Sequence, residues 1–326
     1  MASDPSTLSN RPTYTSNQLT QYFEHINLPQ KYKSLIHGNP HIGQSEHALS
    51  FLTALQKHQL AAVPFENISL HYSPEPGVSL DSEVLFENII ERNMGGYCME
   101  NNCFFATVLR SLGYELFTAG ARVNTAAMPG HEVGPGPKYG GWSHMVNIVT
   151  IRNQRYMVDV GFGSNQSVQP LPLISATPHA NIGAQSVRLL HAPIPQNTTT
   201  QKVWRFQHRA QSDQPWLDGY CFTELEFLPE DYAVMNWNTS TSPTIWFTKS
   251  LICLKSIMEG EEIEGTIVLF DDEIKWTIRG NTKRTLKLRS EGERVQALSE
   301  HFSIDLREDE KAAIVGRRAA IKDEAS

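Results

Sequence analysis

Apolar residues recur at helical spacing through the first third of the chain. From Ser45 onward, Ala48, Phe51, Leu52 and Leu55 recur every three or four positions and would share one face of a helix. Shorter runs of the same kind, several of them preceded by a polar capping residue, indicate further helices. The pattern predicts a helical N-terminal region with helices at 18–26, 30–36, from 45, from about 81 to 92 and from 98 to 112.

After Gly113 the pattern changes to the short apolar runs that are typical of strands, which predicts a domain boundary near this residue. Residues 174–200 are rich in Pro, Ala, Ser and Thr, and we expect an extended insertion or loop without chemistry there. The remaining predicted elements are strands at 114–124, 144–151, 155–160, 202–207, 220–227, 265–270 and 273–278, and helices at 229–237 and from 290.

Composition argues against several classes of function. The chain has 326 residues, of which 40% are hydrophobic and 19% charged, as in an ordinary globular protein with more than one domain. A net charge of −7 without a basic cluster argues against a nucleic-acid partner. No apolar run approaches the roughly 18 residues of a membrane span. Residues 1–17 lack the apolar core of a signal peptide, so we expect a cytoplasmic protein with no membrane contact and no evident protein partner.

The cysteines indicate neither a disulfide framework nor a metal site. There are four of them, Cys98, Cys103, Cys221 and Cys253, and they form no CxxC pair and no Cys/His spacing typical of zinc ligands. We expect free thiols and no metal.

Cys98 is the candidate nucleophile. It follows Gly95-Gly96-Tyr97 and opens a run with helical periodicity. Glycines allow a close backbone approach, and a helix N-terminus favours a thiolate. The alternative is a buried structural cysteine, which is the commoner role for this residue type.

A hairpin further along the chain carries the groups that would activate this thiol. If Arg152-Asn153 makes the turn, Ile151 faces Gln154 and Asp159 lies diagonal to His144 on one face, with Cα atoms about 7–8 Å apart. The pair could equally be an ordinary half-exposed His and Asp.

Together Cys98, His144 and Asp159 have the composition of a Cys-His-Asp triad. The imidazole takes the thiol proton, and the carboxylate orients and stabilises the charged ring. This reasoning leaves open a protease, a transglutaminase-like enzyme and an acyltransferase.

The motifs around these residues resemble one family in the same order along about residues 20–305. The chain is similar to the arylamine N-acetyltransferases. The resemblance is carried by Val63-Pro64-Phe65-Glu66-Asn67-Ile68, Gly95-Gly96-Tyr97-Cys98-Met99-Glu100, Ser143-His144, Val158-Asp159-Val160-Gly161-Phe162-Gly163 and Thr241-Ser242-Pro243.

The resemblance implies an α+β fold in three parts. These are a helical domain at 1–113 with the nucleophilic cysteine, a β-barrel domain at 114–222 with His144 and Asp159, and an α/β lid at 223–326. It also implies ping-pong transfer of an acyl group from an acyl-coenzyme A (CoA) through Cys98 to an aromatic amine, hydrazine or hydroxylamine. Acetyl-CoA is the default donor, and propionyl-CoA or malonyl-CoA is the alternative. A cysteine hydrolase or transglutaminase-like enzyme is the competing interpretation.

The same resemblance implies binding residues. Phe65, Val123 and Phe162 would line the acceptor pocket. Gly140, Gly141 and Thr244 would border CoA.

One position departs from the family pattern. Many members carry arginine where this chain has Met94, and that arginine is expected to pair with the glutamate that corresponds to Glu66. A buried unpaired carboxylate is costly. We therefore expect Arg92 or Arg122 to pair with Glu66.

Overall fold

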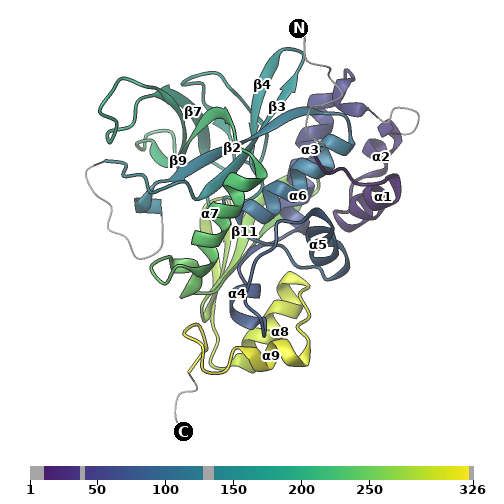
Figure 1. Cartoon of the computed structure of the whole chain (residues 1–326), viewed down its shortest axis with the longest axis vertical. Coiled ribbons are helices and arrows are strands. Elements are labelled where there is room, and N and C mark those ends of the chain that lie inside the picture. Colours follow the sequence, from purple (N-terminus) through teal and green to yellow (C-terminus); the bar gives the residue numbers. More distant parts are fainter. Residues whose placement is uncertain (1–10, 37–40, 128–135, 323–326) are drawn as a thin grey trace.

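The computed structural model describes residues 11–36, 41–127 and 136–322, and Figure 1 shows their arrangement. Helices are concentrated in the first third and at the end of the chain. They are α1 (Ser16–His25), α2 (Gln30–Ile36), α3 (Ala48–Ala62), α4 (Ser69–Tyr72), α5 (Ser82–Phe86), α6 (Cys98–Ser111), α7 (Pro229–Thr241), α8 (Glu291–Phe302) and α9 (Glu308–Ala313). A π-helical turn, Glu87–Glu91, continues α5, and 3-10 turns lie at Ile42–Gln44, Thr125–Ala127 and Trp246–Thr248. No helix in the described ranges is long and apolar enough to cross a bilayer.

Local signals explain why the N-terminal helices begin where they do. Thr15 caps α1 by accepting a hydrogen bond from the Gln18 amide, and the Gln18 side chain binds back to the Thr15 amide. The Asp81 carboxylate caps α5 by accepting from the Glu83 and Val84 amides. The predicted helical N-terminal region is therefore present.

An eight-stranded antiparallel sheet forms the middle of the molecule, in the order β5-β4-β3-β2-β9-β8-β7-β6. Its strands are β2 (Glu115–Val123), β3 (His144–Ile151), β4 (Gln154–Val158), β5 (Leu171–Pro172), β6 (His179–Ala180), β7 (Ser186–Ala192), β8 (Val203–Arg209) and β9 (Leu217–Glu226). The sheet curls into a nearly closed barrel, because Ser175, just after β5, bridges to Leu189 in β7. The predicted α+β class is confirmed.

The prediction of an extended loop at 174–200 was wrong for its central part. Residues 186–192 form β7, which pairs with β8 along its whole length. Val187 and Leu189 are buried in the barrel core, and the alternate residues Ser186, Arg188 and Leu190 are half-buried. The surrounding Pro, Ser and Thr obscured this alternation.

A second, five-stranded antiparallel sheet has the order β1-β10-β11-β12-β13. Its strands are β1 (Phe65–Glu66), β10 (Ile252–Glu259), β11 (Glu262–Phe270), β12 (Glu273–Ile278) and β13 (Asn281–Lys287). β1 comes from the helical region and pairs with β10 at Phe65↔Leu254, so this sheet joins the N-terminal region to the C-terminal third of the chain. The three-part division stays a prediction, and β9 runs across its boundary at 222–223.

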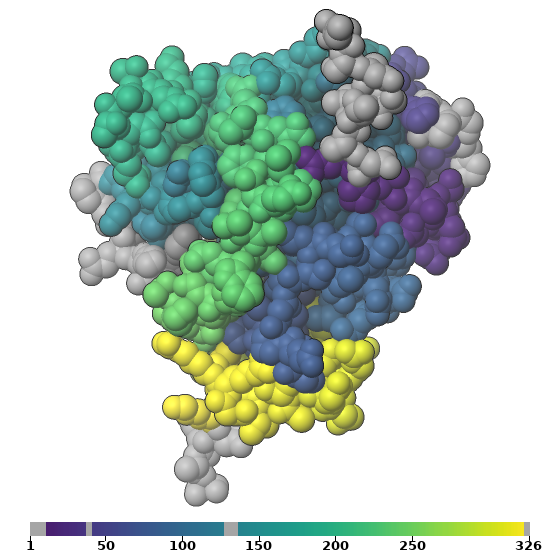
Figure 2. All heavy atoms as spheres, in the orientation of Figure 1, coloured from purple at the N-terminus to yellow at the C-terminus, as the bar shows by residue number. Residues whose placement is uncertain are grey.

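The C-terminal helices pack beneath this sheet and reach back to α4. Figures 1 and 2 show α8 and α9 beside the segment that contains α4. The fully buried Arg294 bonds to the Tyr72 hydroxyl at 2.8 Å and to the Glu291 carboxylate, and Arg317 donates to the Leu70 carbonyl oxygen at 3.0 Å. These bonds fix the C-terminal segment against the N-terminal region.

Candidate active site

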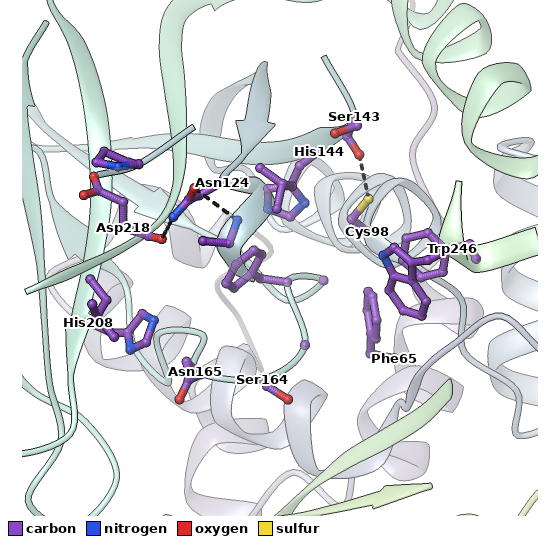
Figure 3. Close-up of a pocket in the computed structure, with 18 of the residues that line it drawn as sticks. Phe65, Cys98, Asn124, Ser143, His144, Ser164, Asn165, His208, Asp218 and Trp246 are labelled. Atoms are coloured by element: carbon purple, nitrogen blue, oxygen red, sulfur yellow. Dashed lines mark hydrogen bonds between the residues drawn. The ribbon is translucent and has the colours of Figure 1, made fainter. Parts of the chain in front are cut away.

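Cys98 is the first residue of α6 and only 4% of its surface is exposed. The Glu100 carboxylate accepts a hydrogen bond of 2.9 Å from the Tyr97 amide and so helps to set the helix start. A side chain at Gly95 would place its Cβ 1.8 Å from the Pro64 carbonyl oxygen. Only glycine therefore allows the loop before Cys98 to pack this closely on Pro64. The thiol donates to the Ser143 carbonyl oxygen at 3.4 Å, which places it beside β3 (Figure 3).

The predicted hairpin has the predicted register, with Ile151 opposite Gln154. β3 begins at His144, and Asp159 directly follows β4. His144 Nε2 and Asp159 Oδ2 lie 2.7 Å apart, and each residue is 1% exposed. The fold thus brings all three residues of the hypothetical triad together at one end of the barrel.

Two further groups hold the Asp159 carboxylate. Asn102 Nδ2 and the Gly161 amide each donate to Oδ1 at 2.9 Å. Asn102 also accepts from the Val160 amide at 3.1 Å. A side chain on Gly161 would place its Cβ 2.8 Å from the Cα atom of Cys98, so this glycine lets the strand end approach α6.

Sequence reasoning missed Asn102. The available signal was its spacing, since it lies four residues after Cys98 and therefore on the same face of α6. It links the helix that carries the thiol to the hairpin that carries His144 and Asp159.

These contacts favour a charged His144–Asp159 pair. Burial opposes the charged imidazole, but the Asp159 charge and hydrogen bond, together with the Cys98 thiol, raise the pKa of His144 to about 10. Burial also opposes the carboxylate, yet the charge of His144 and the hydrogen bonds from His144, Asn102 and Gly161 hold the pKa of Asp159 below its usual value. At neutral pH the ring therefore carries a proton that it can give to a leaving group.

The Cys98 thiol and His144 open on a cavity of about 1310 Å³ (Figure 3). Phe65, Val123 and Phe162, the predicted acceptor residues, all line it, and so does Thr244. The other two residues predicted to border CoA do not. The Gly140 amide instead donates to the Val123 carbonyl oxygen at 3.0 Å, and Gly141 lies beside it.

Four cationic side chains also line the cavity, and the sequence had not indicated any of them. They are Arg188, Arg205, Lys249 and Arg318. Arg205 is neutralised by a two-pronged ion pair with Asp218 at 2.7 and 2.8 Å. Arg188 has no carboxylate partner in the described part of the chain. It donates to Gln207 and packs 4.2 Å from the Trp216 ring centroid. The described residues contain no cluster of three or more His, Cys, Asp or Glu that could hold a metal ion.

Comparison with known proteins identifies the family. Residues 48–311 match the profile of the N-acetyltransferase family. The chain belongs to the arylamine N-acetyltransferase family. It is an acyltransferase that uses an acyl-CoA donor and an amine acceptor, as the family does.

Relatives within the arylamine N-acetyltransferase family carry two kinds of name. N-malonyltransferase FDB2 of Gibberella moniliformis is 38% identical, covering 95% of this chain and 96% of that protein. The protein of the same name in Fusarium pseudograminearum is also 38% identical, over 95% of each chain. Human arylamine N-acetyltransferase 1 is 31% identical, over 65% of this chain and 72% of its own length.

Solved arylamine N-acetyltransferases share the fold. The enzyme from Salmonella typhimurium superposes with a TM-score of 0.74 at 21% identity, covering 92% of this chain and 98% of that one. The Mycobacterium marinum enzyme, solved in complex with CoA, superposes with a TM-score of 0.71 at 25% identity, over 91% and 98% of the two chains.

The expected arginine partner of Glu66 is absent from the described residues. Arg92 binds the Glu310 carboxylate at 2.7 and 2.9 Å, and Arg122 donates to the Gly140 carbonyl oxygen. The Glu66 carboxylate instead accepts hydrogen bonds from the amides of Ile68 and Gly95. Our prediction of a direct ion pair was therefore wrong, because backbone amides of the cysteine loop satisfy the carboxylate.

Glu66 should make stability depend on pH. Burial raises its pKa from 4.5 to about 7, against the two amide bonds and the more distant charge of Arg92. A raised folded-state pKa means that the stability due to the protonated carboxyl is complete below pH 4.5 and is lost as pH rises through about 7. Relative to Glu66→Gln, we expect the wild-type free energy of unfolding to fall by about 3 kcal/mol between pH 4.5 and 8.

Urea unfolding of the two proteins at several pH values measures this difference. Glu75→Gln, which alters an exposed glutamate, is the matched control and should show no such trend. A wild-type minus Glu66→Gln difference that stays constant with pH would contradict the burial argument.

Proposed function

We propose that this chain transfers a malonyl group from malonyl-CoA to an aromatic amine, through a thioester on Cys98. The observation that carries the mechanism is the contact of one buried thiol with a buried His–Asp pair at the wall of a large cavity. The choice of donor is supported by the relatives, because those named N-malonyltransferases are 38% identical over 95% of the chain. The acetyltransferase of human origin is less similar and covers less of it.

In the first half-reaction the Cys98 sulfur, having given its proton to His144, attacks the thioester carbonyl of the donor. The new carbon–sulfur bond forms as the bond to the CoA sulfur breaks, and the departing thiolate takes a proton from the His144 imidazolium. The raised pKa of His144 makes this proton available at neutral pH. The products are acyl-Cys98 and free CoA.

In the second half-reaction the amine nitrogen attacks the acyl-Cys98 carbonyl. His144 accepts the proton that the nitrogen loses, and the Cys98 sulfur departs as a thiolate. An arylamine is largely neutral near pH 7, so it needs positioning more than deprotonation. Phe65 and Phe162, which line the same cavity as the thiol, offer aromatic faces for its ring.

The charges at the cavity wall suit an anionic donor. Malonyl-CoA carries a free carboxylate in addition to its phosphates, and Arg188, Lys249 and Arg318 have no carboxylate partner among the described ion pairs. Arginine and lysine bind carboxylates and phosphates through charge-assisted hydrogen bonds. Thr244 lies at the same wall and remains our candidate for contact with CoA, together with Gly140 and Gly141.

A donor panel tests the proposal. Malonyl-, acetyl- and propionyl-CoA are each supplied with an aniline-type amine, and release of the free CoA thiol is followed. We expect kcat/KM for malonyl-CoA to exceed that for acetyl-CoA by about tenfold or more, because the cavity cations bind the extra carboxylate. Intact mass without amine should show one adduct, which the amine then discharges.

The other outcomes separate the remaining hypotheses. A higher kcat/KM for acetyl-CoA or propionyl-CoA would overturn the malonyl donor and leave acyl transfer standing. An adduct that water discharges as fast as the amine does would instead indicate a cysteine hydrolase.

A further inference from the structure

A second cavity of about 340 Å³ lies between the beginnings of α5 and α7 and one side of α6. None of the residues that line it belongs to the lining of the large cavity. Its volume falls in the range of small-molecule sites. Its apolar wall is made by Pro12, Leu80, Leu85, Ala106, Met145 and Pro229.

Arg110 contributes a cation without an acidic partner to this cavity. Its side chain is half-buried, and no ion pair or hydrogen bond joins it to any residue of the described ranges. Burial and then the neighbouring charge of Arg11 lower its pKa. Among the described residues, Arg11 pairs with Glu226 at 3.3 Å. A half-buried guanidinium beside another cation, with no bound anion, is costly.

Tyr232 contributes a second polar group to this cavity. The residue is 3% exposed and lines the cavity, yet its hydroxyl is buried without a hydrogen bond. Thr118 is a close polar neighbour, and its hydroxyl, which donates to the Phe227 carbonyl oxygen, keeps a lone pair that faces Tyr232. Thr118 is at most a weak partner, so a carboxylate in the cavity would be a better acceptor for the Tyr232 hydroxyl.

We propose that this second cavity binds a small organic acid with one ring and one carboxylate. Arg110 pairs with the carboxylate, Tyr232 donates to it, and the ring packs on the apolar wall. Asp81, the one acid in the lining, does not compete for Arg110, because its carboxylate accepts the Glu83 and Val84 amides at the start of α5.

The cavity lies directly behind the triad. Cys103 and Met145 line it with their sulfur atoms 3.6 Å apart, and each directly follows a residue of the active site, Asn102 and His144 respectively. A ligand there occupies separate space from the acyl-CoA. Its binding should therefore persist when the large cavity is filled.

Calorimetric titration with benzoate as the probe tests the proposal. The host is full-length Cys98→Ser saturated with CoA, so that the large cavity is occupied. We expect benzoate to bind with millimolar or lower Kd, and Arg110→Met to weaken binding by about tenfold or more. Arg152→Met, at the exposed β3–β4 turn, is the matched control and should leave Kd unchanged.

Tyr232→Phe is the second variant, since it removes one oxygen and keeps the ring in place. We expect it to weaken benzoate binding by about threefold to tenfold while thermal unfolding shows a folded protein. Absence of binding to the host would overturn the proposal. Binding that neither variant weakens, or binding that CoA displaces, would place the acid elsewhere and overturn it as well.

Discussion

Replacing Cys98 with serine is expected to lower kcat/KM for acyl transfer by about 10⁴-fold or more. Serine is close to cysteine in size and should preserve the start of α6. Its hydroxyl is a far weaker nucleophile than the thiol, which lies between the Ser143 carbonyl oxygen and the His144 ring. The acyl adduct should also disappear. Release of CoA and intact mass after incubation with malonyl-CoA measure the two effects.

Cys221→Ala is the matched control for this substitution. Cys221 is also a buried free thiol, but it lies in β9 beside Tyr139 and Ile194 and lines neither cavity. The Cys221→Ala variant should still form the acyl adduct and should keep its acyl-transfer activity. An adduct of equal yield in Cys98→Ser would show that another residue carries the acyl group.

Replacing Asp159 with asparagine is expected to lower kcat by about 10³- to 10⁴-fold. The carboxylate orients His144 through the 2.7 Å bond and supplies most of the attraction that keeps the buried ring charged. In the variant, burial acts against the charged ring with only the thiol to oppose it, so the pKa of His144 falls. The alkaline limb of the pH–rate profile should then move to lower pH.

The loss of stability in Asp159→Asn should also depend on pH in a predictable direction. The raised pKa of His144 contributes stability that is complete below pH 6.5 and is lost as pH rises through about 10. The lowered pKa of Asp159 contributes stability above pH 3.8 that is lost as pH falls through its folded-state pKa. Asp159→Asn should therefore destabilise most between about pH 4 and 6.5, and progressively less toward pH 10.

Activity across pH and urea unfolding at each pH test both effects of Asp159→Asn. Asp213→Asn, at an exposed position, is the matched control and should change neither. Full activity with an unchanged pH profile in Asp159→Asn would exclude Asp159 from the triad. A stability loss that does not vary with pH would show that the pair is not ionised.

Local patterns predicted much of the fold because the relevant interactions are close in sequence. Register within the β3–β4 hairpin follows from its two-residue turn, so Ile151↔Gln154 could be read directly. β7 was missed because its flanks resemble a loop, and β10 was missed although it pairs with the next strand, β11, as well as with the distant β1. Partner strands, and not local propensity, decide whether such segments pair.

The candidate site, like the fold, was predicted only in part from the sequence. Motif and spacing pointed to Cys98, His144 and Asp159, but not to Arg188, which reaches the cavity from the strand mistaken for a loop. Asn102 could have been inferred from its i+4 position. Its partners could not, since Met145 and Asp159 belong to the β3–β4 hairpin, more than forty residues along the chain.

The sequence by itself determined the helices, the hairpin, the family and the identity of the reacting groups, because each is encoded in residues that are near neighbours or in a motif of fixed spacing. Only the tertiary structure decided what surrounds them. The amide bonds to Glu66, the cations of the large cavity and the unpaired Arg110 beside Tyr232 depend on the packing of segments that are far apart in the sequence. Burial and charge at a site are properties of that packing, and no local pattern carries them.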